Sequence, residues 1–250
     1  MKERKILDSE IENSSAPIME HLVELRTRII RSLIAFLITM SISFYFADDV
    51  FNFLSLPIIS LLNSYGQNTE LIYTGLQQGF MVHIKISIFS GFLFAFPFIS
   101  FQLWRFVAPG MYKNEKKAFL PFLISSPLLF ILGAAFAFYV VMPLAFDFLL
   151  KFQQNQGDGM VELLKIKYLG SINEYLSLTM AFIIAFGLSF QLPVLLTLLG
   201  KVGLVTSAGL ASFRKYAAVA ILILAALLTP PDVITQIILF SAVYTLYEIS

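Results

Sequence analysis

Long apolar runs separated by short polar segments dominate the sequence. The runs that can cross about 30 Å of hydrocarbon, at about 1.5 Å per residue, lie at roughly 29–47, 84–105, 119–141 and 175–199. Two shorter runs, at roughly 215–229 and 232–249, are separated only by Pro230 and Pro231, which can end one helix and begin the next. The pattern predicts an all-α polytopic membrane protein with six transmembrane helices, of which the last two form a hairpin.

The segment between the first two runs carries a further helix signal. Residues 50–62 are apolar, contain Pro57 and are too short to cross a bilayer, so we expect an interfacial helix that caps the bundle from outside. Residues 1–17 are polar, and no apolar segment of a signal peptide follows them. We therefore expect a disordered tail at 1–17 and a single membrane domain at 18–250.

Positive charges alternate between the two sides of the predicted spans. The segment 48–82, after the first run, contains no Lys or Arg. Basic residues instead precede the first run and follow the second and fourth, among them Arg26, Arg28, Lys116, Lys117 and Lys215. Because cytoplasmic loops carry the excess of Lys and Arg, we expect a multi-pass protein of the cytoplasmic membrane with both termini in the cytoplasm.

The composition agrees with a membrane protein and narrows the chemistry. The chain is 58% hydrophobic and 13% charged, with a mean hydropathy of +0.82. It has no cysteine, and its two histidines, His21 and His83, are far apart, so we expect no metal site and no cofactor. The net charge of +1 gives no sign of nucleic-acid binding.

Two glutamates stand among basic residues next to predicted spans. Glu24 lies four residues before Arg28, which is the spacing of a salt bridge within one helix, and Glu115 directly precedes Lys116 and Lys117. Both carboxylates can instead hold an arginine of a partner, because a guanidinium pairs with a carboxylate in a planar fork. Spacing alone favours internal neutralisation.

Gln191 is the polar residue that lies deepest in a predicted span. Pro193 leaves the carbonyl of Ser189 without its helical donor. The amide of Gln191 can therefore bond that carbonyl or hold a neighbouring helix.

Asp232, after the diproline, has the position of a residue that stabilises a helix N-terminus.

Three motifs in order carry a family resemblance. They are HLVELRTR at 21–28, FVAPGMYKNEKK at 106–117 and LTPPD at 228–232. Together they resemble TatC, the family of receptor subunits of the twin-arginine protein translocase. The resemblance implies that Glu24 and Glu115 recognise the paired arginines of signal peptides. It therefore favours arginine binding over the internal neutralisation that spacing alone favours. It also implies that four further residues help to shape the signal-binding surface: Arg26, Phe106, Pro109 and Tyr112. By position alone, Phe106 and Tyr112 belong to an aromatic belt at the membrane edge, Pro109 to a turn and Arg26 to a helix face.

The resemblance carries further expectations of fold and partners. It implies a cupped bundle open sideways to the membrane, a homo-oligomeric translocase complex, and single-span partners of the TatA and TatB types, with TatA-type helices near Gln191. The family often has Glu where this chain has Gln191, so a neutral hydrogen-bonding role is expected. Pro57, Phe80 and Asp232 also match family positions; the first two are interpreted as scaffold, and both a structural and a functional role stay open for Asp232.

Two other classes of function fit the sequence less well. A secondary transporter or channel needs ionisable groups at mid-membrane or broken helices, and the candidates reduce to Gln191 with a proline kink at Pro97 or Pro193. An intramembrane enzyme needs a nucleophile with its base, or paired aspartates within spans. Because no such set is visible, we expect a receptor and not an enzyme.

Overall fold

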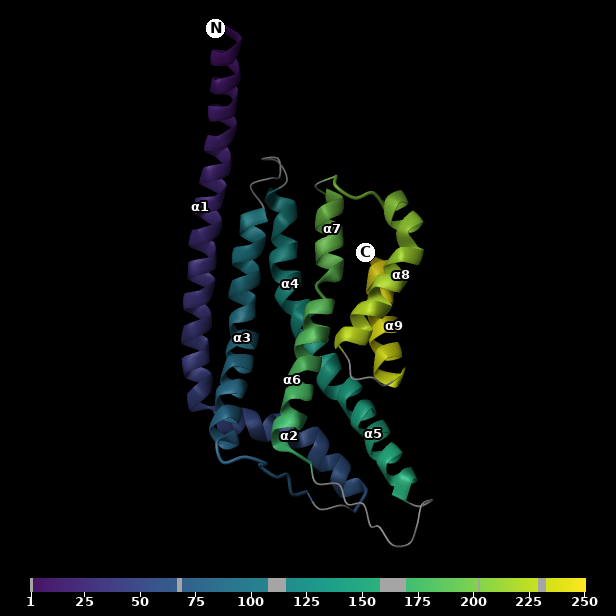
Figure 1. Ribbon diagram of the computed structural model, residues 1–250. Helices are drawn as coiled ribbons and strands as arrows, with labels where there is room; N and C mark the ends of the chain where they lie inside the picture. The colour runs from purple at the N-terminus through teal and green to yellow at the C-terminus, as the bar shows by residue number, and fades with distance from the viewer. Residues whose placement is uncertain (1, 67–68, 108–115, 158–169, 202, 229–232) are drawn as a thin grey trace.

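The computed structural model describes residues 2–66, 69–107, 116–157, 170–201, 203–228 and 233–250. Within these ranges, the side chains of 2–18, 107, 116–120, 152–157 and 228 lie outside the described part. The described chain is helical apart from turns and one isolated bridge between Ile72 and Ser171 (Figure 1). The helices are α1 (Lys2–Tyr45), α2 (Ala47–Ser64), α3 (Gln78–Val107), α4 (Lys116–Phe136), α5 (Met142–Gly157), α6 (Ile172–Ser189), α7 (Leu192–Lys201), α8 (Ser207–Leu228) and α9 (Val233–Ile249).

Five helical segments in the described ranges are long and apolar enough to cross a membrane: Met19–Tyr45, Gln78–Phe106, Pro121–Lys151, Ile172–Lys201 and Ser207–Leu227. The sixth apolar helix, α9, has 17 residues and a length of about 25 Å at about 1.5 Å per residue. The expected multi-pass helical architecture is confirmed, while the exact number of crossings stays a prediction. The bounds of α1 include the polar segment 2–17, for which the tail boundary also stays a prediction.

The third apolar segment is longer than its hydropathy indicated. Between α4 and α5 the chain stays helical through a π-helical segment, Ala137–Val141, and α5 runs at an angle to α4 (Figure 1). α5 then buries Phe146 and Leu150, so its apolar face extends the core past the predicted end at residue 141. Asp147 and Lys151 pair with each other at 2.7 Å, which lets charged residues continue the same helix.

α2 lies across one end of the bundle, below α3 and α6 in Figure 1. This is the helix that the apolar pattern of 50–62 predicted. Leu54, Ile58 and Leu62 recur at helical spacing and are buried, and the Tyr175 hydroxyl of α6 donates to the Leu54 carbonyl at 2.6 Å. We call this end of the bundle the α2 end and the opposite end, where Glu24 lies, the Glu24 end.

Small residues set the closest helix contacts. A Cβ on Gly91 of α3 would lie 2.6 Å from the Cα of Met40 on α1, so the two backbones touch there. Beside it, the Thr39 hydroxyl donates to the Gly91 carbonyl at 2.8 Å. Gly133 of α4 and Gly187 of α6 admit Phe190 and Phe130 in the same way. This is the small-residue packing typical of membrane helices, and it fixes α1 against α3.

Candidate functional site

Glu24 lies on the half-exposed edge of α1 and is paired within its own helix. The Nε and Nη2 atoms of Arg28, one turn later, both donate to Glu24 Oε1, the first at 3.0 Å. The Glu24 side chain is 33% exposed and that of Arg28 only 14%. The internal salt bridge that the spacing predicted is therefore present. It uses only one of the two carboxylate oxygens.

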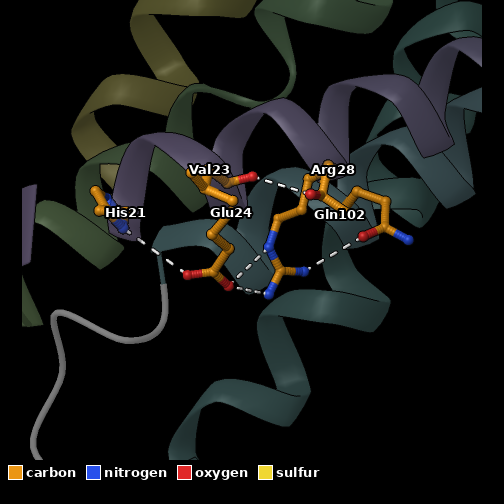
Figure 2. A network of polar contacts seen from close by, with 6 residues as sticks. His21, Val23, Glu24, Arg28 and Gln102 are labelled. Atoms are coloured by element: carbon orange, nitrogen blue, oxygen red, sulfur yellow. Dashed lines mark hydrogen bonds and ion pairs between the residues drawn. The ribbon is translucent and has the colours of Figure 1, made fainter. Parts of the chain in front are cut away.

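A residue of α3 completes the arrangement. Gln102 is buried, and its Oε1 accepts a hydrogen bond from Arg28 Nη1 at 3.3 Å, as Figure 2 shows. On the other side, His21 Nδ1 lies 3.9 Å from Glu24 Oε2 (Figure 2). Because Gln102 holds Arg28 and Arg28 holds Oε1, the carboxylate is fixed in direction. Among the described residues, its Oε2 has only the long contact to His21, so it can accept a further donor.

Phe106 joins the same site from the end of α3. Its ring stacks on His21, with centroids 4.2 Å apart and planes inclined by 13°. Arg26 is exposed on α1. Glu115, Pro109 and Tyr112 lie outside the described residues. Their segment joins α3 to α4, whose flanking ends both lie at the Glu24 end (Figure 1).

The other sequence candidates lie elsewhere. Pro57 is half-buried within α2, and Phe80 is 60% exposed at the start of α3, so both belong to the α2 end. Asp232 lies outside the described residues. The structure therefore brings Glu24, Arg26 and Phe106 to one end of the bundle and does not bring Pro57 or Phe80 to it. In the ranges that the structure describes, no three His, Cys, Asp or Glu side chains are grouped as metal ligands.

Gln191 lies at the break between α6 and α7. Its Nε2 donates to the backbone carbonyl of Ser126 on α4 at 2.7 Å, and its Oε1 accepts from the Ser126 hydroxyl at 2.6 Å. The sequence left two partners open for the Gln191 amide, the Ser189 carbonyl and a neighbouring helix. In the structure the amide bonds the neighbouring helix, α4. Gln191 also lines a cavity of about 650 Å³ bounded by α3, α4 and α6–α9, which gives the bundle its hollow side.

Trp104 shares this cavity with Gln191. The Trp104 side chain is 5% exposed, and its Nε1 has no acceptor among the described residues. None of the described side chains that line the cavity is ionisable. The cavity thus combines apolar walls with a few neutral hydrogen-bonding groups, which suits a helix or an apolar chain better than an ion.

Replacing Gln191 with Leu is expected to lower the stability of the protein in detergent. The change removes both hydrogen bonds to Ser126, and such bonds between membrane helices contribute about 0.6 to 2 kcal/mol. Thermal unfolding should show a lower Tm for Gln191→Leu. Gln191→Glu, which keeps an acceptor for the Ser126 hydroxyl, should lose less; an unchanged Tm for the Leu variant would contradict the assignment.

These features define a multi-pass helical membrane protein with a polar cluster around Glu24 at one end and an apolar cavity beside Gln191. A family model described as Sec-independent protein translocase protein (TatC) matches residues 20–241. The chain belongs to this family. It is a component of Sec-independent protein translocation and not an enzyme.

Individual relatives agree over nearly the whole chain. TatC of Aquifex aeolicus is 45% identical over 94% of this chain and 92% of its own length. TatC of Magnetococcus marinus is 43% identical over 94% of this chain and 82% of its own length. TatC of Escherichia coli is 37% identical over 93% of this chain and 86% of its own length. A crystal structure of the twin-arginine translocase receptor TatC superposes with a TM-score of 0.76 at 45% identity, covering 92% of this chain and 96% of that one.

Proposed function

We propose that this chain is the receptor that binds the paired-arginine signal peptides of folded proteins, with Glu24 and Glu115 as the carboxylates that take the guanidinium groups. The observation that carries the proposal is the state of Glu24, a half-exposed carboxylate that is fixed through Oε1 and whose Oε2 has no hydrogen bond from the described residues. A guanidinium of the peptide can approach Oε2 without displacing Arg28. The similar crystal structure is that of a twin-arginine translocase receptor, which supports the same function.

The charge balance of the site explains why one carboxylate is not enough. Glu24 is already neutralised by Arg28, and Arg26 adds a positive charge to the same edge of α1. An incoming pair of arginines therefore needs further negative charge to be held. Glu115 belongs to the segment that begins two residues after Phe106, and it supplies that charge in this proposal.

The Glu24 end faces the cytoplasm in this proposal, in a protein of the cytoplasmic membrane. The support is the alternation of basic residues, since the segment 48–82, which contains α2, has no Lys or Arg. Signal peptides are made in the cytoplasm, so the recognition site must lie on that side. The α2 end then lies at the outer interface.

The lateral cavity is the proposed place for a single-span partner. Its apolar walls and the neutral groups of Gln191 and Trp104 fit a transmembrane helix that carries a polar residue. We assign it to a TatA-type partner, with a TatB-type helix packing near α8, in a homo-oligomeric translocase. The absence of ionisable side chains among the described lining residues does not favour the transporter alternative.

Peptide binding to the purified full chain tests the proposal. A fluorescent signal peptide with an arginine pair is titrated with the protein in lipid nanodiscs, and the same peptide with a lysine pair is the control. The arginine peptide should bind at least about tenfold more tightly, because lysine cannot form the planar two-bond fork. Equal affinities would contradict arginine recognition.

Gln102 is expected to act on the peptide through Arg28 and Glu24. Gln102→Leu removes the acceptor that holds Arg28 Nη1, so the Glu24 carboxylate loses its fixed direction. We expect peptide affinity to fall about threefold to tenfold, the size of one ordinary hydrogen bond, because Gln102 acts on the peptide only through Arg28 and Glu24. In a Glu24→Gln background the same change should cost nothing more, whereas independent losses would show that Gln102 acts by another route.

A further inference from the structure

A second apolar cavity, of about 620 Å³, shares no lining residue with the cavity of Gln191. It is lined mainly by residues 89–97 of α3 and residues 130–135 of α4. Ile183 of α6 lines it, and α2 and the π-helical segment 137–141 complete its walls. Its volume falls within the range of about 300 to 1,000 Å³ that is usual for small-molecule sites.

Exposed aromatic side chains form part of the cavity wall. Phe94 of α3 and Tyr139 of the π-helical segment line it and are each 67% exposed. Phe53 of α2, also part of the lining, stacks on Phe138 with centroids 4.7 Å apart. The π-helical segment thus places one ring against α2 and the next one outward. An acyl chain of the surrounding bilayer can enter between these rings.

The mouth of the cavity carries a single negative charge. Asp49, in the first turn of α2, is the one charged side chain among the described lining residues, and it is exposed. In the part of the chain that the structure describes, no cation lies within ion-pair distance of it. Its neighbour Asp48 is held instead by His83 Nε2 at 2.8 Å. Among the described residues, the site therefore offers no cation to this carboxylate.

We propose that this cavity binds a phospholipid whose headgroup carries a primary ammonium, with an acyl chain between α3 and α4 and the ammonium on Asp49. Such a lipid supplies the missing cation at the level of the interface and apolar chains below it. An anionic lipid would place its phosphate beside Asp49 with no compensating charge. A partner helix would cover Asp49 and leave it unpaired unless it brought its own cation. The proposal does not depend on the signal-peptide function.

Photoactivatable lipids test the proposal in the full chain. The protein is reconstituted in nanodiscs of equal parts phosphatidylethanolamine and phosphatidylglycerol, with a trace of either lipid carrying a diazirine in its acyl chain. Labelling of the peptides that contain Phe94 and Tyr139 is compared with labelling of the lipid-facing side of α1. The ethanolamine probe should label the cavity peptides about fivefold more than the glycerol probe, and both should label α1 alike.

Two variants separate the headgroup contact from the apolar groove. Asp49→Asn should reduce the preference to near unity, and Ala134→Phe, which fills the cavity, should lower cavity labelling by both probes. Leu132→Phe, an exposed α4 position outside the cavity, is the matched control and should change neither. Equal labelling by the two probes, a preference that survives Asp49→Asn, or no lipid labelling because a protein helix fills the cavity would each overturn the proposal.

Discussion

Glu24→Gln is expected to weaken the binding of an arginine-pair peptide by about tenfold to a hundredfold. The substitution keeps the shape of the side chain but removes the charge, so a guanidinium loses a charge-assisted contact of about 1.5 to 3 kcal/mol. Arg28 also loses its partner, and its positive charge then repels the incoming arginine. Titration of the purified variant with the fluorescent peptide measures the effect.

Glu20→Gln is the matched control for this substitution. Glu20 lies one turn before Glu24 on α1, is exposed, and undergoes the same change of charge. The affinity of the Glu20→Gln variant for the peptide should stay within about twofold of the value for the unsubstituted protein, since exposed charges contribute little. A similar loss in both variants would show that the peptide responds to the overall charge of α1 and not to Glu24.

Gly91→Ala is expected to cause a large loss of stability, and a larger one than the same methyl addition at Gly79, the other glycine of α3. The new Cβ would lie 2.6 Å from the Met40 Cα and 2.8 Å from the Met40 nitrogen, so α1 must move away. Overpacking of this kind costs about 1 to 3 kcal/mol and should lower the Tm in detergent by several degrees. Because Glu24, Arg28 and Gln102 bridge the same two helices, peptide affinity should fall as well.

The same helix offers the control. A Cβ on Gly79 of α3 would meet only the Tyr73 ring, at an ordinary distance of 3.9 Å. Gly79→Ala should therefore leave the Tm and the peptide affinity nearly unchanged. Equal Tm values for the Gly91 and Gly79 variants would show that α1 is not held at Met40.

Much of the helical architecture follows from the apolar pattern of the chain. The proline-interrupted segment 50–62 was too short to span, and it forms α2 as predicted. The apolar run 119–141 predicted too early an end for this helix. The helix continues through the π-helical segment and α5 to Gly157, and the Asp147–Lys151 ion pair lies within that extension. Hydropathy alone does not register such a pair, since each charged residue lowers the average whether or not it is neutralised.

The candidate site was predictable only along α1. The four-residue spacing of Glu24 and Arg28 predicted their ion pair, which the structure contains. Gln102 and the stacking of His21 on Phe106 depend on how α1 lies against α3, and the sequence gives no local signal of that alignment. The close approach of Gly91 to Met40 is one of the contacts that hold α1 against α3. For Gln191, spacing left two partners open, and the packing of α4 beside α6 selects Ser126.

Site-specific photo-crosslinking of an arginine-pair signal peptide, in native membranes, tests the central claim most directly. Photoreactive residues are placed beside Glu24 and beside Glu115, and a lysine-pair peptide serves as the control. The receptor function predicts crosslinks from both positions that disappear with the lysine pair. No crosslink from either position, in a protein shown to be inserted with both termini in the cytoplasm, would contradict it.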